Sequence, residues 1–316
     1  MTDKNKTAPE AYGLSKPIRL LVEKTISQIE HTMAGSDGSS GIATGFADLD
    51  KLTGGWQRGD MVVVASRPAV GKTSFLLSMV NTIAVNQKRA VAIFSMEVSG
   101  MQITSRLISM GSGIGSDKLR SGELSDAEVS ILREHAERVA DAPIFIDDRA
   151  DLKTSELCAE ARRLKSEHNV ELIIIDHLQV IARDMKRRDA SREQEVSGTS
   201  RSIKRLAREL NIPIVVISQL NRSVETRGGD KRPMLSDLRE SGAIEQDADV
   251  VCFLYRAEYY GIHEDENGPA LGVGEVIVAK HRNGPVGAVR MRFIPELAKF
   301  ADWQSIPQWH GLPRNE

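Results

Sequence analysis

Eight consecutive residues, Ser66 to Thr73, combine the residue types that bind the phosphates of a nucleotide. They follow an apolar run at 61–65 and precede a helical pattern at 74–80. A strand, a tight loop and a helix N-terminus in this order direct backbone N–H groups at a polyphosphate. Lys72 would reach the β- and γ-phosphates, and the Thr73 hydroxyl would bind Mg²⁺. The candidate nucleotide-binding residues are Ser66, which stands where a glycine is usual, Arg67, Pro68, Ala69, Val70, Gly71, Lys72, Thr73 and Ser74.

Two carboxylates follow predicted strands and could complete such a site. Asp176 ends the apolar run 172–175, where it could hold the Mg²⁺, although an ordinary turn aspartate also fits this position. Glu97 lies just past a strand ending at Phe94 and could deprotonate an attacking water. A glutamate at the start of the next helix is an equally good interpretation of Glu97. With the phosphate loop, these positions predict hydrolysis of a nucleoside triphosphate.

Further polar residues lie at predicted strand ends and in the loops that follow. Gln219 comes after the run 214–217 and either contacts the γ-phosphate or is solvated. Lys280 and Arg282 project from one strand, whose edge could equally be solvated. Two basic loops could track a nucleic-acid backbone, and neither has interleaved aromatic residues for base stacking. Their basic residues are Arg183, Lys186, Arg187, Arg188 and Arg192 in the first loop, and Arg222, Arg227, Lys231, Arg232 and Arg239 in the second.

The composition is that of a globular protein in a reducing compartment. The 316 residues are 41% hydrophobic and 27% charged, and no apolar run reaches the length of a membrane span. The polar start does not resemble a signal peptide, so we expect a cytoplasmic protein with no membrane partner. Cys158 and Cys252 are predicted to be buried free thiols. The net charge of −2 excludes a globally basic nucleic-acid coat.

Strands and helices alternate from Gly41 onward, which predicts a mostly parallel, doubly wound α/β sheet. The apolar runs have the near-continuous character of strands buried on both faces. Capping-box spacings begin predicted helices at Ser125 and Ser191. The strand-forming runs are 61–65, 90–94, 144–146, 172–175 and 214–217, followed after residue 249 by 250–254, 274–280, 287–294 and 298–303.

The flanking segments are simpler. We expect a disordered tail at 1–13, an amphipathic helix at 14–34 with Ser15 as N-cap, and a flexible linker at 35–41. The helix must bury its apolar stripe either on its own domain or on a neighbouring molecule. The main domain spans 42–303, and the tail at 304–316 is either disordered or a docking peptide.

Several segments together resemble the ATPase domain of the DnaB-type replicative DNA helicases, which are ring-shaped motors with a RecA-like fold. They occur in the family's order between about Gly41 and Trp303, and as a set they are highly specific. The matching segments are 45–50, 54–56, 67–68, 71–73, 94–97, 175–179, 218–222, 231–233, 237–249 and 280–285.

The resemblance implies roles for residues whose interpretation was open. Glu97 becomes the catalytic base and Gln219 the γ-phosphate sensor, with ATP and Mg²⁺ as ligands. Lys280 and Arg282 become finger residues that reach the nucleotide of the neighbouring subunit. Arg239, Glu240 and Gly242 become contacts to single-stranded DNA. A homohexamer, 5′–3′ polarity, and a helicase loader or primase as further partners are implied in the same way.

The chain departs from the family in a few places. Only about forty residues precede Gly41, too few for the family's N-terminal collar domain, and the helix at 14–34 takes the position of its linker helix. His177 stands where a tyrosine is commoner. Two alternatives stay open: a RecA-type recombinase that forms filaments, and an ATP-gated scaffold or loader that does not unwind DNA.

Overall fold

The computed structural model describes residues 17–34, 40–178, 181, 192–265 and 268–303, and for residues 24, 28, 31–34, 192, 193, 239–243 and 265 it describes the backbone alone. Its internal contacts divide the chain into two units, residues 1–40 and 41–316, which we describe separately. The predicted tails at 1–13 and 304–316, most of the linker at 35–41, and the first basic loop at 183–188 lie outside the described residues.

The first unit contains one helix, α1 (Ile18–Ala34). Its apolar side chains recur at three- and four-residue spacing, and those that the structure describes are exposed, from 41% for Leu20 to 75% for Ile18. The helix begins just after Pro17, whose carbonyl accepts a hydrogen bond from the Leu20 N–H. The predicted N-cap, Ser15, lies outside the described residues. An exposed apolar stripe of this kind lowers its free energy only when it is covered.

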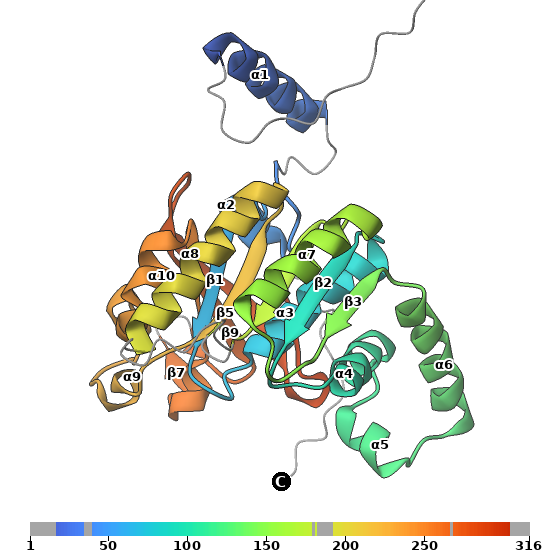
Figure 1. The fold of residues 1–316 in the computed structure, drawn as a ribbon. Helices are drawn as coiled ribbons and strands as arrows, with labels where there is room; N and C mark the ends of the chain where they lie inside the picture. The colour runs from blue at the N-terminus through green and yellow to red at the C-terminus, as the bar shows by residue number, and fades with distance from the viewer. Residues whose placement is uncertain (1–16, 35–39, 179–180, 182–191, 266–267, 304–316) are drawn as a thin grey trace, which may run out of the picture. The chain divides into compact units, whose positions relative to one another are not determined.

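The second unit is built on a nine-stranded sheet with the order β11-β10-β9-β6-β1-β5-β4-β2-β3 (Figure 1). The strands from β6 to β3 in this order run parallel, whereas β9, β10 and β11 extend the sheet in antiparallel fashion. This confirms the predicted α/β class. The strands are β1 (Met61–Ser66), β2 (Val91–Ser95), β3 (Ile144–Asp147), β4 (Leu172–Asp176), β5 (Ile214–Gln219), β6 (Val250–Tyr255), β9 (Val273–His281), β10 (Gly287–Ile294) and β11 (Lys299–Asp302), with a separate pair, β7 (Glu264–Asp265) and β8 (Gly268–Pro269).

Helices cover both faces of the sheet, so the central strands are buried on both sides. Because side chains alternate along a strand, Val62 and Val64 of β1 pack in one core layer, while Met61 and Val63 pack in the other. The helices are α2 (Ala47–Thr53), α3 (Lys72–Val80), the π-helix η1 (Asn81–Asn86), α4 (Gly100–Ser112), α5 (Ser116–Ser121), α6 (Asp126–Ala140), α7 (Thr154–His168), α8 (Arg192–Leu210), α9 (Ser223–Thr226), η3 (Leu235–Ser241), α10 (Gly242–Asp247), η4 (Ala257–Tyr260) and η5 (Pro295–Leu297).

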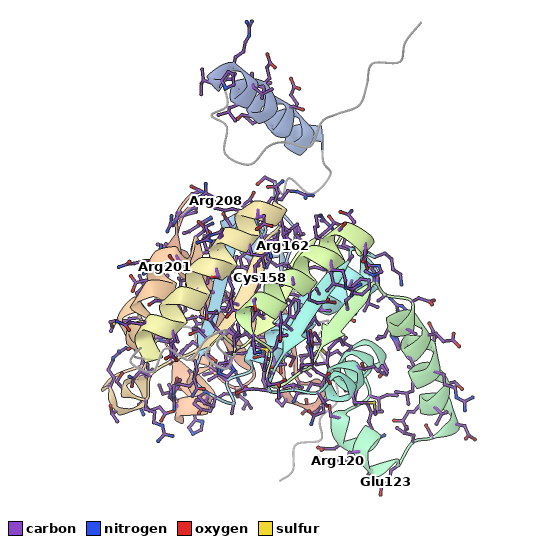
Figure 2. The ribbon with its side chains drawn as sticks, viewed as in Figure 1. Arg120, Glu123, Cys158, Arg162, Arg201 and Arg208 are labelled. Carbon is purple, nitrogen blue, oxygen red and sulfur yellow. The ribbon has the colours of Figure 1, made fainter. Side chains whose placement is uncertain are left out.

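In helix α8, apolar residues recur at three- and four-residue spacing and therefore lie on the face that packs against the sheet. Ile203 and Leu206 are buried against the sheet, whereas Arg201 and Arg208 lie on the outer surface (Figure 2). No helix in the described part of the chain is both long enough and apolar enough to cross a bilayer. Cys158 and Cys252 are buried free thiols, as predicted.

Two local expectations have different outcomes. The capping box at Ser125 is confirmed, since its hydroxyl accepts from the Glu128 N–H and the Glu128 carboxylate accepts from the Ser125 N–H. The box predicted at Ser191 lies outside the described residues. The expectation that every apolar run is buried on both faces is wrong for β3, whose four residues are only half-buried. This strand pairs with β2 alone because it forms the edge of the sheet.

Asp60 lies just before β1, at the end of the sheet where the parallel strands begin, and the pKa of its carboxyl links the stability of the fold to pH. Burial, followed by the nearby Asp249 carboxylate, raises the pKa of Asp60 to about 6. The folded state therefore holds this proton more tightly than the unfolded chain, and ionisation of Asp60 destabilises the fold above about pH 6. The destabilisation disappears as the pH falls from 6 towards the ordinary value of 3.8.

We therefore expect Asp60→Asn to raise the free energy of unfolding by about 1 kcal/mol near pH 8, after solvent screening of the full shift. The gain should shrink clearly near pH 5. Urea unfolding of both proteins at the two pH values measures this, with Asp48→Asn on α2 as a control at an exposed carboxylate. An equal gain at both pH values would show that the ionised carboxylate is not the cause.

Candidate nucleotide-binding site

The phosphate loop connects the C-terminal end of β1 to the first turn of α3, which begins at Lys72. Val70 is fully buried and anchors the middle of the loop in the core. Gly71 has a φ of 116°, and a Cβ at this position would lie 3.0 Å from the Phe300 ring. Both the backbone conformation and the close approach therefore require glycine here. The loop ends at the N-terminus of α3, where helix N–H groups attract anions.

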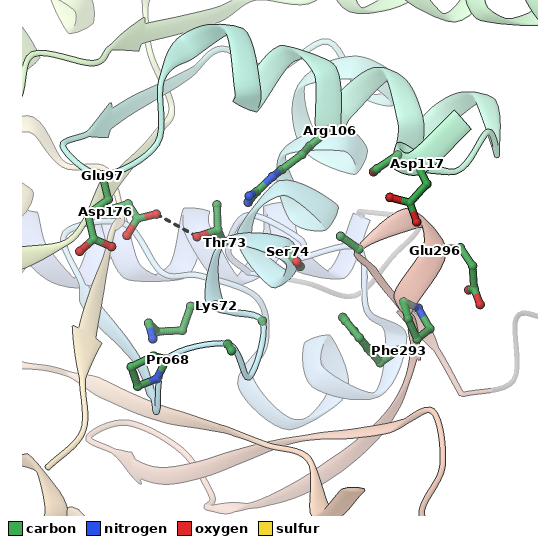
Figure 3. Close-up of a pocket in the computed structure, with 15 residues that line it drawn as sticks. Pro68, Lys72, Thr73, Ser74, Glu97, Arg106, Asp117, Asp176, Phe293 and Glu296 are labelled. Atoms are coloured by element: carbon green, nitrogen blue, oxygen red, sulfur yellow. Dashed lines mark hydrogen bonds between the residues drawn. The ribbon is translucent and has the colours of Figure 1, made fainter. Parts of the chain in front are cut away.

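A pocket of about 500 Å³ opens at this loop (Figure 3). It is lined by residues from the loop, from two neighbouring strand ends, from the α4–α5 region, and from the end of β10 with the turn that follows it. They are Pro68, Ala69, Gly71, Lys72, Thr73, Ser74, Glu97, Asp176, Arg106, Ser116, Asp117, Phe293, Pro295, Glu296 and Ala298. The structure thus brings together six of the nine predicted loop residues with both predicted carboxylates.

Thr73 and Asp176 form the candidate cation site. The Thr73 hydroxyl donates a 3.1 Å hydrogen bond to Asp176 Oδ2 (Figure 3). Asp176 ends β4 beside Ser95 of β2, and its burial raises its pKa, although the Thr73 hydrogen bond acts in the opposite direction. Ligand atoms of Glu97, Asp176 and His177 also lie within 4.8 Å of one another. Hydroxyl and carboxylate oxygens are the ligands that Mg²⁺ prefers, so the donor set fits this ion.

Lys72 is the basic group on the loop side of the pocket. Its Nζ lies 3.3 Å from the Ser66 carbonyl and 3.2 Å from the Arg67 carbonyl. Burial lowers its pKa, while the Asp176 and Glu97 carboxylates oppose that shift. A partly buried ammonium interacts with a phosphate in the same pocket more strongly than a fully exposed one does.

Glu97 projects from the turn between β2 and α4. The Ser95 hydroxyl donates to the Val98 carbonyl at 2.7 Å and accepts from the Val98 N–H, which closes this turn. The Glu97 side chain is 56% exposed, and its Oε1 lies 3.3 Å from His177 Nδ1. A carboxylate in this place can accept a proton from a water in the pocket.

Gln219 and three of the predicted loop residues do not line the pocket. Gln219 ends β5 next to Ser66 in the sheet, and its side chain is exposed. Val70 is turned into the core. The side chain of Arg67 is 6% exposed and contacts the segment that follows β5.

Lys280 and Arg282 lie far from the pocket of their own chain. Lys280 pairs with Val251 near the start of β6, and Val250 pairs with Val62 of β1. The phosphate loop follows the opposite end of β1 at Ser66, which is about 13 Å from Val62 at 3.3 Å per residue. Lys280 Nζ donates to the Glu245 carbonyl at 2.6 Å, and Arg282 Nε donates to the Ala248 carbonyl at 3.3 Å.

The predicted DNA contacts fall on one connection. Arg239 and Glu240 lie in η3, and Gly242 is the first residue of α10, although their side chains are outside the described part. Two other basic residues of this loop are already paired within the fold. Arg227 forms an ion pair with buried Asp237, and Arg232 pairs with Glu275. They hold the loop in place, which reduces their availability to a nucleic acid.

Sequence reasoning missed the residues that close the pocket opposite the strand ends. Arg106 extends from α4 toward Thr73, and Asp117 with Phe293 and Glu296 lies further along the wall (Figure 3). A signal existed only for Arg106, a basic residue on the helix that follows Glu97. Phe293 and Glu296 are more than 200 residues from the loop in sequence, and only the position of the β10–β11 turn brings them there.

The strand order, the loop and the carboxylate at the end of β4 define a nucleotide-binding P-loop domain of the RecA-like kind. The chain belongs to the family described as the DnaB-like helicase C-terminal domain, which matches residues 41–302. It is 44% identical over 291 residues to the replicative DNA helicase DnaB of Geobacillus stearothermophilus and 43% identical over 296 residues to the replicative DNA helicase DnaC of Bacillus subtilis. These matches cover 92% and 94% of this chain but only 63% and 64% of the relatives.

Solved structures agree with this assignment. One, described as an ATPase domain, has a TM-score of 0.82 at 34% identity, and the match covers 91% of this chain and 99% of that one. A DnaB-like replicative helicase, whose structure was described together with its interactions with primase, has a TM-score of 0.80 at 34% identity, covering 91% of this chain and 67% of that one. The RadB recombinase shares the fold, with a TM-score of 0.51 at 20% identity over 83% of this chain and 99% of that one.

Proposed function

We propose that this chain is a subunit of an ATP-dependent replicative DNA helicase that translocates on single-stranded DNA as a homohexameric ring and unwinds duplex DNA with 5′–3′ polarity. The observation that carries the proposal is the convergence of Lys72, Thr73, Asp176 and Glu97 on one pocket in a chain of this family. ATP is the proposed nucleotide. The chain spans slightly less than two thirds of the relatives' length, and the activity of the whole protein is proposed from that part.

Each pocket residue has a proposed task. The loop N–H groups and Lys72 bind the phosphates, and Thr73 with Asp176 holds Mg²⁺. Bound Mg²⁺ would offset the negative charge of the phosphates. Glu97 orients an attacking water and takes its proton, and the contact with His177 limits the directions in which this carboxylate can point. Gln219 senses the γ-phosphate, which its place beside Ser66 at the strand end supports.

Lys280 and Arg282 are proposed to act on the neighbouring subunit's nucleotide. Their distance from the pocket of their own chain supports this assignment, because they cannot reach it across the sheet. Cationic side chains at a phosphoryl group stabilise the charge that develops in the transition state. In this arrangement a complete site forms only between two subunits, and hydrolysis depends on assembly.

The remaining proposals concern DNA, the flanking segments and partners. Arg239, Glu240 and Gly242 contact the backbone of single-stranded DNA from the connection between η3 and α10. The exposed stripe of α1 is proposed to pack on a neighbouring subunit, with 35–41 as the linker and 42–303 as the motor domain. A helicase loader or primase is a further proposed partner, since one similar helicase was described with primase.

Two other functions remain as alternatives. A strand-binding filament of the recombinase type is favoured only by the shared fold of RadB. A scaffold that binds ATP and DNA without unwinding would use the same pocket. Strand separation by closed rings distinguishes the helicase from both.

The test compares the wild type with Glu97→Gln on a forked DNA duplex, with ATP turnover, ATP affinity and particle mass measured on the same samples. The wild type should form hexamers that separate the strands. Glu97→Gln should assemble and bind ATP like the wild type, but lose turnover by about 10²-fold or more and with it strand separation. Glu123→Gln on the exposed turn after α5 is the matched control. Turnover by rings without strand separation would contradict the helicase proposal and favour the scaffold.

A further inference from the structure

Arg67 directly follows β1 and begins the phosphate loop, yet its guanidinium points away from the pocket. The side chain is 6% exposed. Its Nε donates to Glu225 Oε1 at 2.7 Å, and its Nη1 donates to the Leu220 carbonyl at 2.8 Å. Burying a charged group costs free energy unless hydrogen bonds satisfy it, and the guanidinium of Arg67 makes two such bonds. Arg67 therefore ties the first turn of the phosphate loop to the chain immediately after β5.

One carbonyl group, that of Ser66, contacts both Lys72 in the pocket and the segment after β5. The Ser66 carbonyl accepts from the Leu220 N–H at 3.2 Å and also lies 3.3 Å from Lys72 Nζ. The Arg67 carbonyl lies 3.2 Å from that ammonium. A phosphate bound in the pocket would compete with these two carbonyls for the N–H donors of the Lys72 ammonium. Nucleotide binding would therefore alter the contacts of Ser66, whose carbonyl accepts from the Leu220 N–H.

The connection continues from Leu220 to the proposed DNA segment. The Asn221 N–H donates to the Asp237 carbonyl at 3.2 Å. The Asp237 carboxylate is buried, pairs with Arg227 and accepts from the Met234 N–H at 2.7 Å. Asp237 belongs to η3, two residues before Arg239. Two backbone hydrogen bonds, connected by the peptide bond between Leu220 and Asn221, thus join the phosphate loop to η3 within one subunit.

We propose that Arg67 is a positioning residue that fastens the phosphate loop to the 220–237 segment through Leu220 and Glu225, and so couples nucleotide binding to the DNA-contacting connection. The inference rests on the proposed function for the identity of the nucleotide and the DNA. It assigns Arg67 a task distinct from that of Lys72, since one guanidinium holds the loop from behind while the ammonium faces the phosphates. Two sites joined in this way influence each other reciprocally.

Glu225 offers the test, because it contacts Arg67 and does not line the pocket. Glu225→Ala removes the carboxylate partner, whereas Glu225→Gln keeps an oxygen that can accept from Arg67 Nε. Glu225 is 38% exposed on the short helix α9, so neither change leaves a cavity in the core. Glu264→Ala, an exposed glutamate of β7, is the matched control. All four proteins are compared as full chains.

The first readout is hydrogen exchange of residues 220–237 without nucleotide and with ADP and Mg²⁺. In Glu225→Ala we expect this segment to exchange about ten-fold faster and to lose its response to ADP, since a charged hydrogen bond is gone. The affinity for ADP should change less than about two-fold, the resolution of such a comparison. Glu225→Gln and Glu264→Ala should behave like the wild type. Unchanged hydrogen exchange in Glu225→Ala would overturn the inference. A loss of ADP affinity large enough to explain the lost response to ADP would overturn it as well.

The second readout is ATP turnover with and without single-stranded DNA. Glu225→Ala should keep its DNA-free turnover and lose most of the stimulation by DNA, about ten-fold if the tie carries the coupling. Retained stimulation would overturn the inference. If single-stranded DNA did not stimulate ATP turnover of the wild type, the proposed function would be overturned instead. The hydrogen-exchange data would then test independently whether Arg67 fastens the phosphate loop to the 220–237 segment.

Discussion

Replacing Arg282 with alanine should lower ATP turnover of the assembled protein by on the order of 10³-fold or more, while the fold and the affinity for ATP stay intact. The reason is positional. Arg282 follows β9 at the end of the sheet opposite the phosphate loop, and we propose that in the ring its guanidinium faces the phosphates of the next subunit. Its side chain is 47% exposed, and its contacts are the carbonyls of Gln246 and Ala248 and the Asp249 carboxylate.

The measurement is turnover at saturating ATP and DNA, with particle mass recorded to confirm assembly. Arg290→Ala is the matched control, since Arg290 lies on the adjacent strand β10 and stacks on Trp303. It should retain nearly full turnover. Full turnover in an assembled Arg282→Ala protein would exclude the proposed action in trans.

Lys72→Ala should lower ATP turnover by on the order of 10²–10³-fold or more, because it removes a cation that the fold already holds in the pocket. ATP affinity should fall as well, since Lys72 would contact the phosphates in the ground state. Turnover and ATP binding measured side by side check both effects. Lys51→Ala on the exposed face of α2 is the control, and turnover near the wild-type rate in Lys72→Ala would remove the phosphate loop from the mechanism.

The two variants become more informative when they are mixed. A subunit with Arg282→Ala has an intact phosphate loop, and a subunit with Lys72→Ala has an intact Arg282. If the sites form between subunits, random mixing restores roughly a quarter of them, whereas neither variant alone is active. No recovery in mixed hexamers would show that Arg282 and Lys72 serve the same subunit's nucleotide.

The phosphate loop and the strand pattern could be predicted because both depend on local sequence. A buried parallel strand requires a run of apolar, largely β-branched residues, and a phosphate loop requires Gly71, Lys72 and Thr73 in sequence. Asp176 and Glu97 could be expected near the loop, since parallel strands place their C-terminal ends at one edge. Their separation, the Thr73–Asp176 hydrogen bond and the His177–Glu97 contact required the fold.

Arg67 shows the limit of such reasoning. Its place in the motif predicts a nucleotide contact, yet its side chain is directed to Glu225 and Leu220 behind the loop. Sequence position specifies where a backbone runs, but a side chain points to whichever partner the packing supplies. The partner here is 158 residues away and reaches Arg67 only because β5 lies next to β1.

The class of fold, the phosphate loop and the two carboxylates were therefore predictable without the structure, because they follow from local pattern and from the direction of parallel strands. Which side chains meet depends on the tertiary structure. It added Arg106 and the β10–β11 turn to the pocket wall, turned Arg67 away from the pocket, and placed Lys280 and Arg282 at the far edge of the sheet. These outcomes depend on strand order and on contacts between residues remote in sequence, and a local pattern does not encode either of them.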